Sequence, residues 1–193
     1  NVAWRTKIAG VGWSSPIVWE DKIFLTSVVA DEAYEAPSAG LYLPPTGSDP
    51  PPDPPPGTHH WMVFCFDLTT GELLWQRTAH QGTAPSSIHP KNSFASATPV
   101  TDGDRVYVLF GNLGLFAYDF NGVRLWSRDI EARADRWGWG TGSSPTLLGD
   151  QLLVLHDNEQ ESYLASFNSA TGDQNWRVVR NEVTGWSTPF VWR

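Results

Sequence analysis

The sequence predicts an all-β fold built from repeated four-stranded antiparallel units, and three observations support this. A phrase of small residues, a proline and a short apolar run recurs four times, around Pro16, Pro99, Pro145 and Pro189. A glycine turn that leads into a tryptophan recurs three times, at Trp75, Trp126 and Trp176. The 17 glycines, 15 prolines and 11 tryptophans, with only 18% charged residues, are typical of short strands joined by tight turns.

The two phrases alternate with a period of about 50 residues, as in repeat architectures. Each unit contains four short apolar runs, separated in places by strong hairpin signals such as Asp102-Gly103 and Asn121-Gly122. Consecutive hairpins favour the blade of a β-propeller over a parallel solenoid, whose turns would not alternate as hairpins. The predicted fold class is therefore a partial β-propeller of four-stranded antiparallel blades.

The repeat boundaries predict one incomplete propeller domain over residues 1–193. Residues 1–9 are interpreted as the last strand of a preceding blade, and residues 181–193 as the first strand of a following one. Three blades lie between them, over residues 10–80, 81–131 and 132–180. A closed propeller needs at least four blades, so we expect about three and a half blades of a seven- or eight-bladed ring. The remaining blades of a parent chain would be needed to close that ring.

Each predicted blade runs through four strands in chain order. In the first blade, residues 22–29 alternate between two faces, as a strand that packs on both sides does. The predicted strands are 14–19, 22–29, 61–68 and 72–78 in the first blade, 97–101, 105–110, 115–119 and 124–129 in the second, and 143–148, 151–157, 163–167 and 175–179 in the third.

A polar insertion over residues 30–60 separates the second and third strands of the first blade. Its centre, residues 44–56, is rich in proline. Proline has no backbone N–H and is therefore kept out of the interior of a sheet. We expect an extended, solvated loop with polyproline character.

Charge and cysteine content exclude several function classes. A net charge of −8 argues against nucleic-acid binding, which needs a basic face. The single cysteine, Cys65, excludes an internal disulfide and a cysteine-clustered metal site, and its apolar surroundings predict a buried side chain. The sequence has no apolar run of about 18 residues, so no transmembrane segment is expected. His59-His60 lack a third ligand at metal-binding spacing, and no metal site is predicted.

The glycine-turn phrase resembles the repeat of the pyrroloquinoline-quinone-type (PQQ-like) propellers. Residues 65–75 and 166–176 carry the pattern small-x-Asp/Asn-x-x-Thr-Gly-x-x-x-Trp, and residues 117–126 carry a copy one residue shorter with Asn121 in place of the threonine. The resemblance covers the chain outside 30–60. That superfamily includes quinoprotein dehydrogenases, the lipoprotein of the outer-membrane barrel-assembly machinery and many secreted bacterial proteins of unknown role. Residues 89–96 and 180–182 look most like the last group, which implies a periplasmic or extracellular location.

The repeated glycines and tryptophans have a structural interpretation that needs no cofactor. The glycine turn closes a hairpin, and the tryptophan places a large amphipathic ring in the seam between two blades. The residues assigned to this docking role are Trp4, Trp75, Trp126, Trp176, Gly71, Gly122 and Gly172.

Topology places the second-to-third and fourth-to-first connections of the blades on one face, where the unusual polar residues gather. Loops on a rigid scaffold often carry function. The candidates for a ligand or partner face are His89, Lys91, Asn92, Asp157, Arg180 and Glu182, with His156, Arg136 and Trp139 nearby. Each has a structural alternative: His89 as a loop cap, Lys91 and Asn92 as solvated polar residues or partners of buried backbone, Asp157 as a turn cap, and Arg180 with Glu182 as an ion pair.

No catalytic residue is predicted, because neither paired carboxylates nor a nucleophile beside a base stand out. We expect a binding scaffold for a protein or glycan partner, without a cofactor. The alternative is a quinoprotein dehydrogenase. The resemblance implies that such an enzyme holds the quinone with calcium, an acidic base and often a disulfide of adjacent cysteines. The chain has one cysteine, and no dense cluster of oxygen ligands for calcium stands out.

Overall fold

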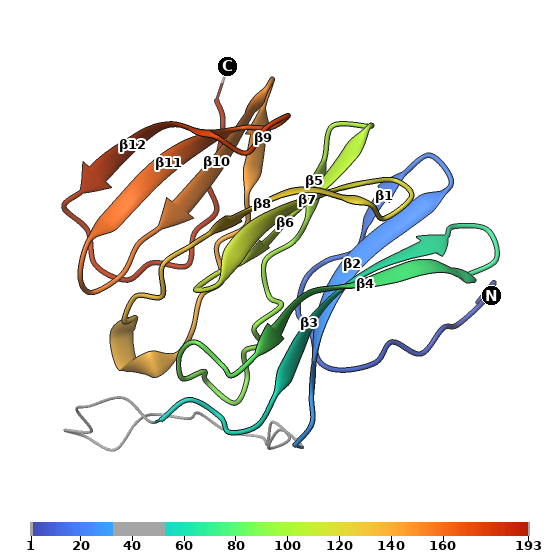
Figure 1. Ribbon diagram of the computed structural model, residues 1–193, viewed down its shortest axis with the longest axis horizontal. Helices are drawn as coiled ribbons and strands as arrows, with labels where there is room; N and C mark the ends of the chain where they lie inside the picture. The colour runs from blue at the N-terminus through green and yellow to red at the C-terminus, as the bar shows by residue number, and fades with distance from the viewer. Residues whose placement is uncertain (1, 33–52, 193) are drawn as a thin grey trace.

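A computed structural model gives the structure of residues 2–32 and 53–192. Within these ranges, twelve strands form three four-stranded sheets, and each sheet is antiparallel throughout (Figure 1). The strands are β1 (Ile17–Trp19), β2 (Lys22–Ala30), β3 (His59–Asp67) and β4 (Leu73–Gly82); β5 (Val100–Thr101), β6 (Arg105–Phe110), β7 (Gly114–Asp119) and β8 (Arg124–Asp129); and β9 (Thr146–Leu148), β10 (Gln151–His156), β11 (Ser162–Asn168) and β12 (Gln174–Arg180). The all-β prediction and the four-stranded blades are confirmed.

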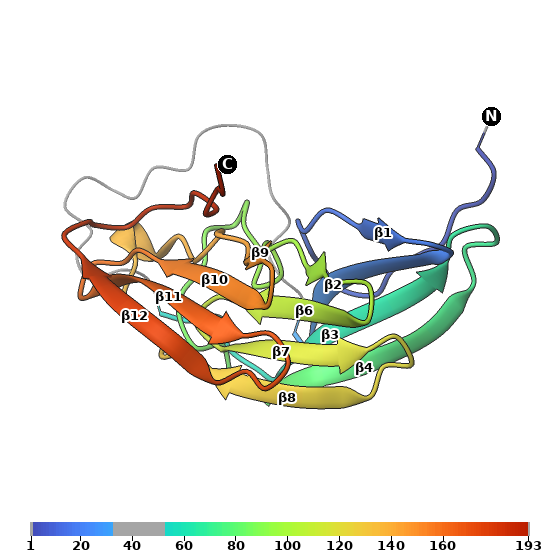
Figure 2. The same cartoon turned by 90° about the horizontal axis from the view of Figure 1, so that it is seen from above.

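The three sheets follow one another as blades of an arc. Figure 2 shows β4, β8 and β12 along the convex rim, with β1 and β9 on the opposite, inner side. The inner strands are short because each begins directly after the proline of the repeated phrase, at Ile17, Val100 and Thr146. Proline is tolerated at the start of a strand because no ladder N–H is required there.

The core lies in the two seams between neighbouring blades. Strand β6 of the middle blade is buried on both faces, because its side chains alternate between the seams. Val106, Val108 and Phe110 pack with residues of the first blade, whereas Tyr107 and Leu109 pack with residues of the third. Each seam is therefore a continuous layer of interdigitated apolar side chains from two sheets.

Cys65 belongs to the seam between the first and second blades. Its side chain is fully buried, and burial raises the pKa of the thiol to about 11. The thiol is therefore protonated at neutral pH and packs as a small apolar group, as the sequence predicts.

The turns between the last two strands of each blade explain the polar part of the repeated phrase. In the first blade, the carboxylate of Asp67 accepts hydrogen bonds from the backbone N–H groups of Thr69 and Thr70 at 2.9 and 2.7 Å. Asn168 makes the equivalent bonds in the third blade, to Ala170 and Thr171. These side chains imitate a backbone turn, which is why Asp or Asn stands at this position.

Two predicted end strands differ from the structure. Residues 2–9 and 181–192 contain no strand, although Trp4 and Ile8 pack on the outer face of the first sheet beside Phe64 and Phe66. A strand needs a hydrogen-bonded neighbour, and in the described part of the chain neither segment pairs with a strand of the three sheets. The domain boundaries built on these strands stay a prediction.

The insertion in the first blade is shorter than predicted. Strands β2 and β3 pair as far as Ala30 and His59, so the connection between them spans residues 31–58. Of its proline-rich centre, residues 44–52 lie outside the described residues. Residues 53–58 contain no strand. No helix in the described ranges is long and apolar enough to cross a membrane.

Candidate functional site

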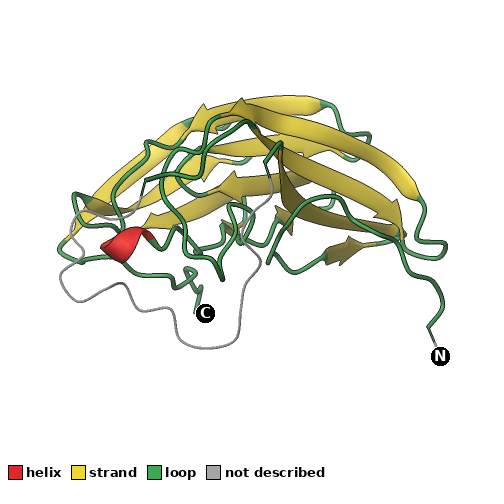
Figure 3. Cartoon of the chain, turned by 90° about the horizontal axis from the view of Figure 1, so that it is seen from below, coloured by secondary structure: helices red, strands yellow, loops and turns green. Residues whose placement is uncertain are grey.

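The two ends of the blades differ in construction. The "turn face" carries the short hairpin turns, including those around Gly71, Gly122 and Gly172. The "loop face" carries the longer connections, in which the one short helix of the described ranges, η1 (Arg136–Gly138), also lies (Figure 3). On the loop face, Asn112 joins three segments: its amide nitrogen donates to the Ser86 hydroxyl and the Arg133 carbonyl at 3.2 Å each, and its Oδ1 lies 3.0 Å from Nε2 of His156.

On the turn face, tryptophans lie on glycines of the following blade. The indole N–H groups of Trp75 and Trp126 donate to the carbonyls of Phe120 and Ser169 at 2.8 and 3.0 Å. Below these rings, Gly122 and Gly172 have positive φ, and a Cβ on either would stand 2.7 or 2.5 Å from the indole.

Trp4 repeats this arrangement on Gly71, and its N–H donates to the Leu68 carbonyl at 3.0 Å. Trp176 differs, because its side chain is 38% exposed and meets no turn glycine among the described residues.

His89 and Asn92 hold the connection between the first and second blades in shape. Nδ1 of His89 accepts the backbone N–H of Lys91 at 3.0 Å. The Asn92 amide donates to the carbonyls of Trp139 and Thr141 at 2.8 and 3.1 Å. Its Oδ1 accepts the Ser93 N–H and the Ser96 hydroxyl, so Asn92 ties two loops together. The Lys91 side chain is exposed.

Arg180 pairs with Asp157, not with Glu182, so that predicted ion pair is wrong. Nε of Arg180 lies 2.9 Å from Oδ1 of Asp157, and a second nitrogen lies 3.3 Å from Oδ2. The end of β12 lies beside the start of β11, which turns Arg180 toward the loop that follows β10. The Asp157 carboxylate is 6% exposed, whereas Glu182 is exposed and uses its carbonyl to accept the Ser162 hydroxyl at 2.8 Å.

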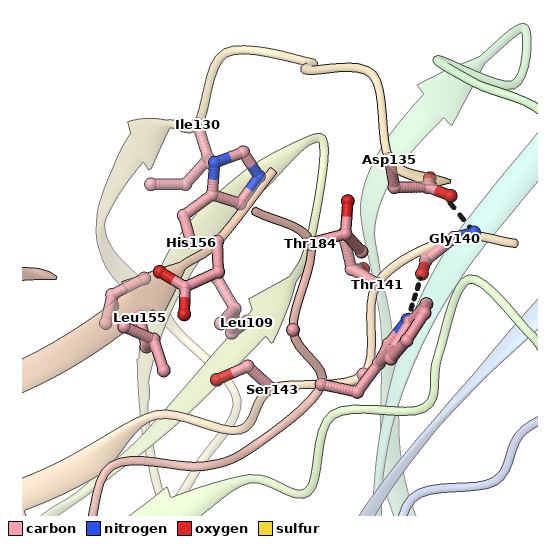
Figure 4. A pocket seen from close by; sticks show the side chains of 15 residues that line it. Leu109, Ile130, Asp135, Gly140, Thr141, Ser143, Leu155, His156 and Thr184 are labelled. Atoms are coloured by element: carbon pink, nitrogen blue, oxygen red, sulfur yellow. Dashed lines mark hydrogen bonds between the residues drawn. The ribbon is translucent and has the colours of Figure 1, made fainter. Parts of the chain in front are cut away.

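Two buried titratable groups lie at the seam between the second and third blades, on the loop face (Figure 4). The carboxylate of Asp135 accepts the backbone N–H groups of Trp139 and Gly140 at 2.5 and 3.0 Å, and burial raises its pKa. His156 is buried, and desolvation, with Arg133 and Arg177 nearby, lowers its pKa to about 4. The imidazole is therefore neutral at pH 7. Sequence reasoning did not single out Asp135.

A cavity of about 20 Å³ lies between these groups, with room for roughly one water molecule. His156 and Asp157 line it from the third blade, and Asp135 and Ser143 line it from the connection between the second and third blades. Figure 4 shows His156, Asp135 and Ser143 around this pocket. The buried Ser143 hydroxyl has no hydrogen-bond partner among the described residues. The cavity is too small for an organic substrate, so it is not a catalytic pocket.

Aromatic rings form a cluster on the loop face that the sequence analysis did not recognise. The Trp139 ring lies 4.6 Å from Trp137, 6.0 Å from Trp186 and 5.2 Å from His89, between ring centroids. The Arg136 guanidinium stands 4.3 Å from the Trp137 ring. Trp137 and Trp186 remain 39% and 40% exposed.

A hollow of about 440 Å³ adjoins this cluster. Its walls come from three segments: residues 10–13, the end of the insertion at 53–55, and the connection at 88–92. Trp13 forms part of it with an indole that is 59% exposed. This volume lies within the usual range of ligand pockets.

The described residues do not fit a quinone cofactor held with calcium. Among residues 2–32 and 53–192, no group of three or more His, Cys, Asp or Glu side chains could hold a metal ion. Three acids at the loop face are already bonded within the fold: Asp135 to backbone N–H groups, Asp157 to Arg180, and Glu159 to Thr184. No catalytic step is derived through such a cofactor.

Comparisons with known proteins agree on the architecture. A sequence model of the family described as outer membrane protein assembly factor BamB matches residues 61–190. A relative of that name from Legionella pneumophila (strain Paris) is 24% identical over 132 residues, which cover 65% of this chain and 30% of the relative.

The similar solved structures include two alcohol-oxidising enzymes. A quinohemoprotein alcohol dehydrogenase, ADHIIG from Pseudomonas putida HK5, superposes with a TM-score of 0.55 at 16% identity, over 91% of this chain and 22% of that one. A europium-containing methanol dehydrogenase superposes with a TM-score of 0.53 at 16% identity, over 85% and 24%. At these identities the likeness shows the fold alone, and the chain spans under a third of each relative. Because the family match covers more than half of the sequence, the chain belongs to the PQQ-like repeat propellers, in the family described as outer membrane protein assembly factor BamB.

Proposed function

We propose that this chain is part of a non-catalytic propeller that binds a partner protein through its loop face. One observation carries the proposal: several polar groups with acid–base chemistry are bonded within the fold, whereas several indoles stay exposed. Asp135, Asp157 and His156 hold neighbouring loops. Trp13, Trp137 and Trp186 offer large rings to solvent. Exposed tryptophans are typical anchors of protein interfaces.

The family match supports a partner of this kind, because its description names an assembly factor for outer membrane proteins. The same description favours a periplasmic or extracellular location. A glycan is less well supported as the ligand. Sugar recognition needs many available hydrogen-bonding groups, and the amide nitrogen and oxygen of Asn92 are already bonded within the protein. The alternative, a quinoprotein dehydrogenase, rests on fold likeness to the two alcohol-oxidising enzymes.

Site-specific photo-crosslinking in the full protein tests the proposal. A photoreactive amino acid replaces Trp186 on the loop face or, as a matched control, Val123 on the turn face, which is 56% exposed. We expect a crosslinked partner polypeptide from position 186 alone. Crosslinks from position 123 alone, or from neither, would contradict the proposal. Saturable uptake of the quinone with calcium, accompanied by dye-linked alcohol oxidation, would favour the dehydrogenase instead.

A further inference from the structure

The hollow and the aromatic cluster form one continuous track on the loop face. His89 lines the hollow, and its ring lies 5.2 Å from that of Trp139. Trp139 in turn contacts Trp137 and Trp186. We call these four side chains, together with Trp13 at the opposite end, the "aromatic track". It crosses the connections of successive blades, so it offers an extended surface, not a single deep pocket.

The lining of the hollow selects for a ligand that is apolar and poor in hydrogen-bond donors. Besides Trp13, it contains Ile88 and the rings of Pro55 and Pro90. The Asn92 amide also lines it, but both its nitrogen and its oxygen are bonded to the protein. The Asn92 amide therefore does not replace the hydrogen bonds that the N–H groups of a bound peptide lose to water. Proline residues have no N–H to lose.

One charged side chain at the edge of the hollow favours one orientation of a bound ligand. Asp53 lines the hollow beside Pro55, at the described end of the insertion. A carboxylate at the edge of an apolar groove favours a basic residue on the ligand.

Trp137 gives an independent sign that the track has a function. Its φ is +64°, one of two positive values among the described non-glycine residues. This conformation costs a bulky side chain about 1 kcal/mol or more, and such strain gathers at binding sites. A glycine at this position would relieve the strain, yet the chain holds a half-exposed indole there.

We propose that the aromatic track binds a proline-rich segment of the partner protein, in the extended polyproline conformation and with a basic residue near Asp53. The inference rests on the proposed function, because it names the chemistry of the partner at the same face. Aromatic grooves recognise such segments because the polyproline helix is already extended and loses little entropy on binding. Proline rings then stack on the indoles along the track.

Calorimetric titration of the full protein tests the inference. The probe is a capped peptide of ten L-prolines preceded by one arginine, and the control is its D-enantiomer, which has the same composition and the opposite helical hand. Two variants remove parts of the track, Trp13→Ala and Trp137→Gly. Trp192→Ala is the matched control, since that indole is 86% exposed and lies outside the track.

We expect saturable binding of the L-peptide, weak or no binding of the D-peptide, and a loss of roughly tenfold or more in affinity for both track variants, as for interface anchors. Trp192→Ala should bind like the wild type. Trp137→Gly should also keep or raise the urea midpoint, because glycine accepts positive φ. If Trp137→Gly stays folded but loses affinity for the peptide, the Trp137 indole contacts the ligand.

Other outcomes overturn the inference. These are no binding of the L-peptide, equal binding of both enantiomers, full affinity in both track variants, or binding of chitohexaose in place of the peptide. If photo-crosslinking at position 186 still captures a partner while the L-peptide does not bind, the proposed function stands and only this inference fails. If neither occurs, both fail.

Discussion

Two tryptophans of the turn face, Trp75 and Trp126, are buried, whereas Trp13 and Trp137 of the loop face are exposed. On the turn face, Trp75 lies on Gly122, its ring is 8% exposed, and its N–H is bonded to a carbonyl of the next blade. On the loop face, Trp13 and Trp137 are far more exposed, and Trp137 has a strained backbone. The first arrangement stabilises the seam between blades. The second keeps apolar surface in water, which costs free energy unless a partner covers it.

The faces also carry titratable groups with different pKa shifts. On the turn face, the contacts of indoles with glycines and carbonyls do not titrate, but hydrogen bonds from Thr70 lower the pKa of the Asp67 carboxylate. On the loop face, burial raises the pKa of Asp135 and lowers that of His156. Acidification therefore acts on the two faces through different groups.

The largest expected effect is on the turn face, from Gly122→Ala. Alanine at φ +77° is strained, and its Cβ would stand 2.7 Å from the Trp75 ring. We expect a loss of about 2–4 kcal/mol in the free energy of unfolding, from backbone strain plus overpacking. Urea denaturation measures it.

Gly149→Ala is the matched control for this change. Gly149 also has positive φ, at +62°, but no atom lies within 4 Å of a Cβ built there. Gly149→Ala should lower the free energy of unfolding by only about 1 kcal/mol, because only the backbone strain of alanine at positive φ applies there. Equal losses at both positions would show that the indole contact does not constrain the turn.

The second prediction concerns pH on the loop face. The His156 pKa of about 4 lies below its value of 6.5 in an unfolded chain, so the unfolded state binds more protons between these values. The stability due to the neutral imidazole is full above pH 6.5 and is lost as the pH falls toward 4. At pH 5 the loss is about 2 kcal/mol relative to pH 8.

Urea denaturation of wild type and His156→Gln at pH 8 and pH 5 measures this term. The variant should lose less stability than the wild type on acidification. Asp135, whose pKa is raised, acts in the opposite direction, but it is present in both proteins and cancels in the comparison. His80→Gln, which removes an exposed histidine, is the matched control variant. The same pH response in His156→Gln as in the wild type would contradict the assignment.

The third prediction removes one indole N–H from a seam. Trp126→Phe keeps most of the ring but leaves the Ser169 carbonyl, which now accepts the indole N–H at 3.0 Å, without a donor. We expect a loss of about 1–2 kcal/mol in thermal or urea unfolding. Trp176→Phe should cost under about 0.5 kcal/mol in this chain, because that indole is half-exposed. A larger loss of unfolding free energy in Trp176→Phe than in Trp126→Phe would contradict this prediction.

The turn face could be predicted from the sequence because its contacts repeat. The same Gly–Trp phrase at a period of about 50 residues predicts a hairpin turn and a seam tryptophan in each copy. The loop face does not repeat. The bond of Arg180 to Asp157 depends on how β12 ends beside β11, which sequence spacing does not encode.

The exposed tryptophans show the same limit. Trp13 and Trp186 each stand three residues before a repeated proline, a signal that was available in the sequence. Trp137 had no such signal, because its positive φ follows from the path of one irregular loop. The strands predicted at the two ends of the sequence, over residues 1–9 and 181–193, are not present in the described residues. An apolar pattern alone does not supply the hydrogen-bonded neighbour that a strand needs.

The smallest expected effect compares two adjacent serines near the loop face. The Ser144 hydroxyl accepts the backbone N–H of Thr98 at 2.9 Å, so Ser144→Ala should cost about 1 kcal/mol. Within residues 2–32 and 53–192 the buried Ser143 hydroxyl has no hydrogen-bond partner, so Ser143→Ala should be neutral or slightly stabilising in urea denaturation. A clear loss at Ser143 would instead mean that a water in the adjoining cavity bonds this hydroxyl, and the seam on the loop face would then depend on that water as the turn face depends on its indoles.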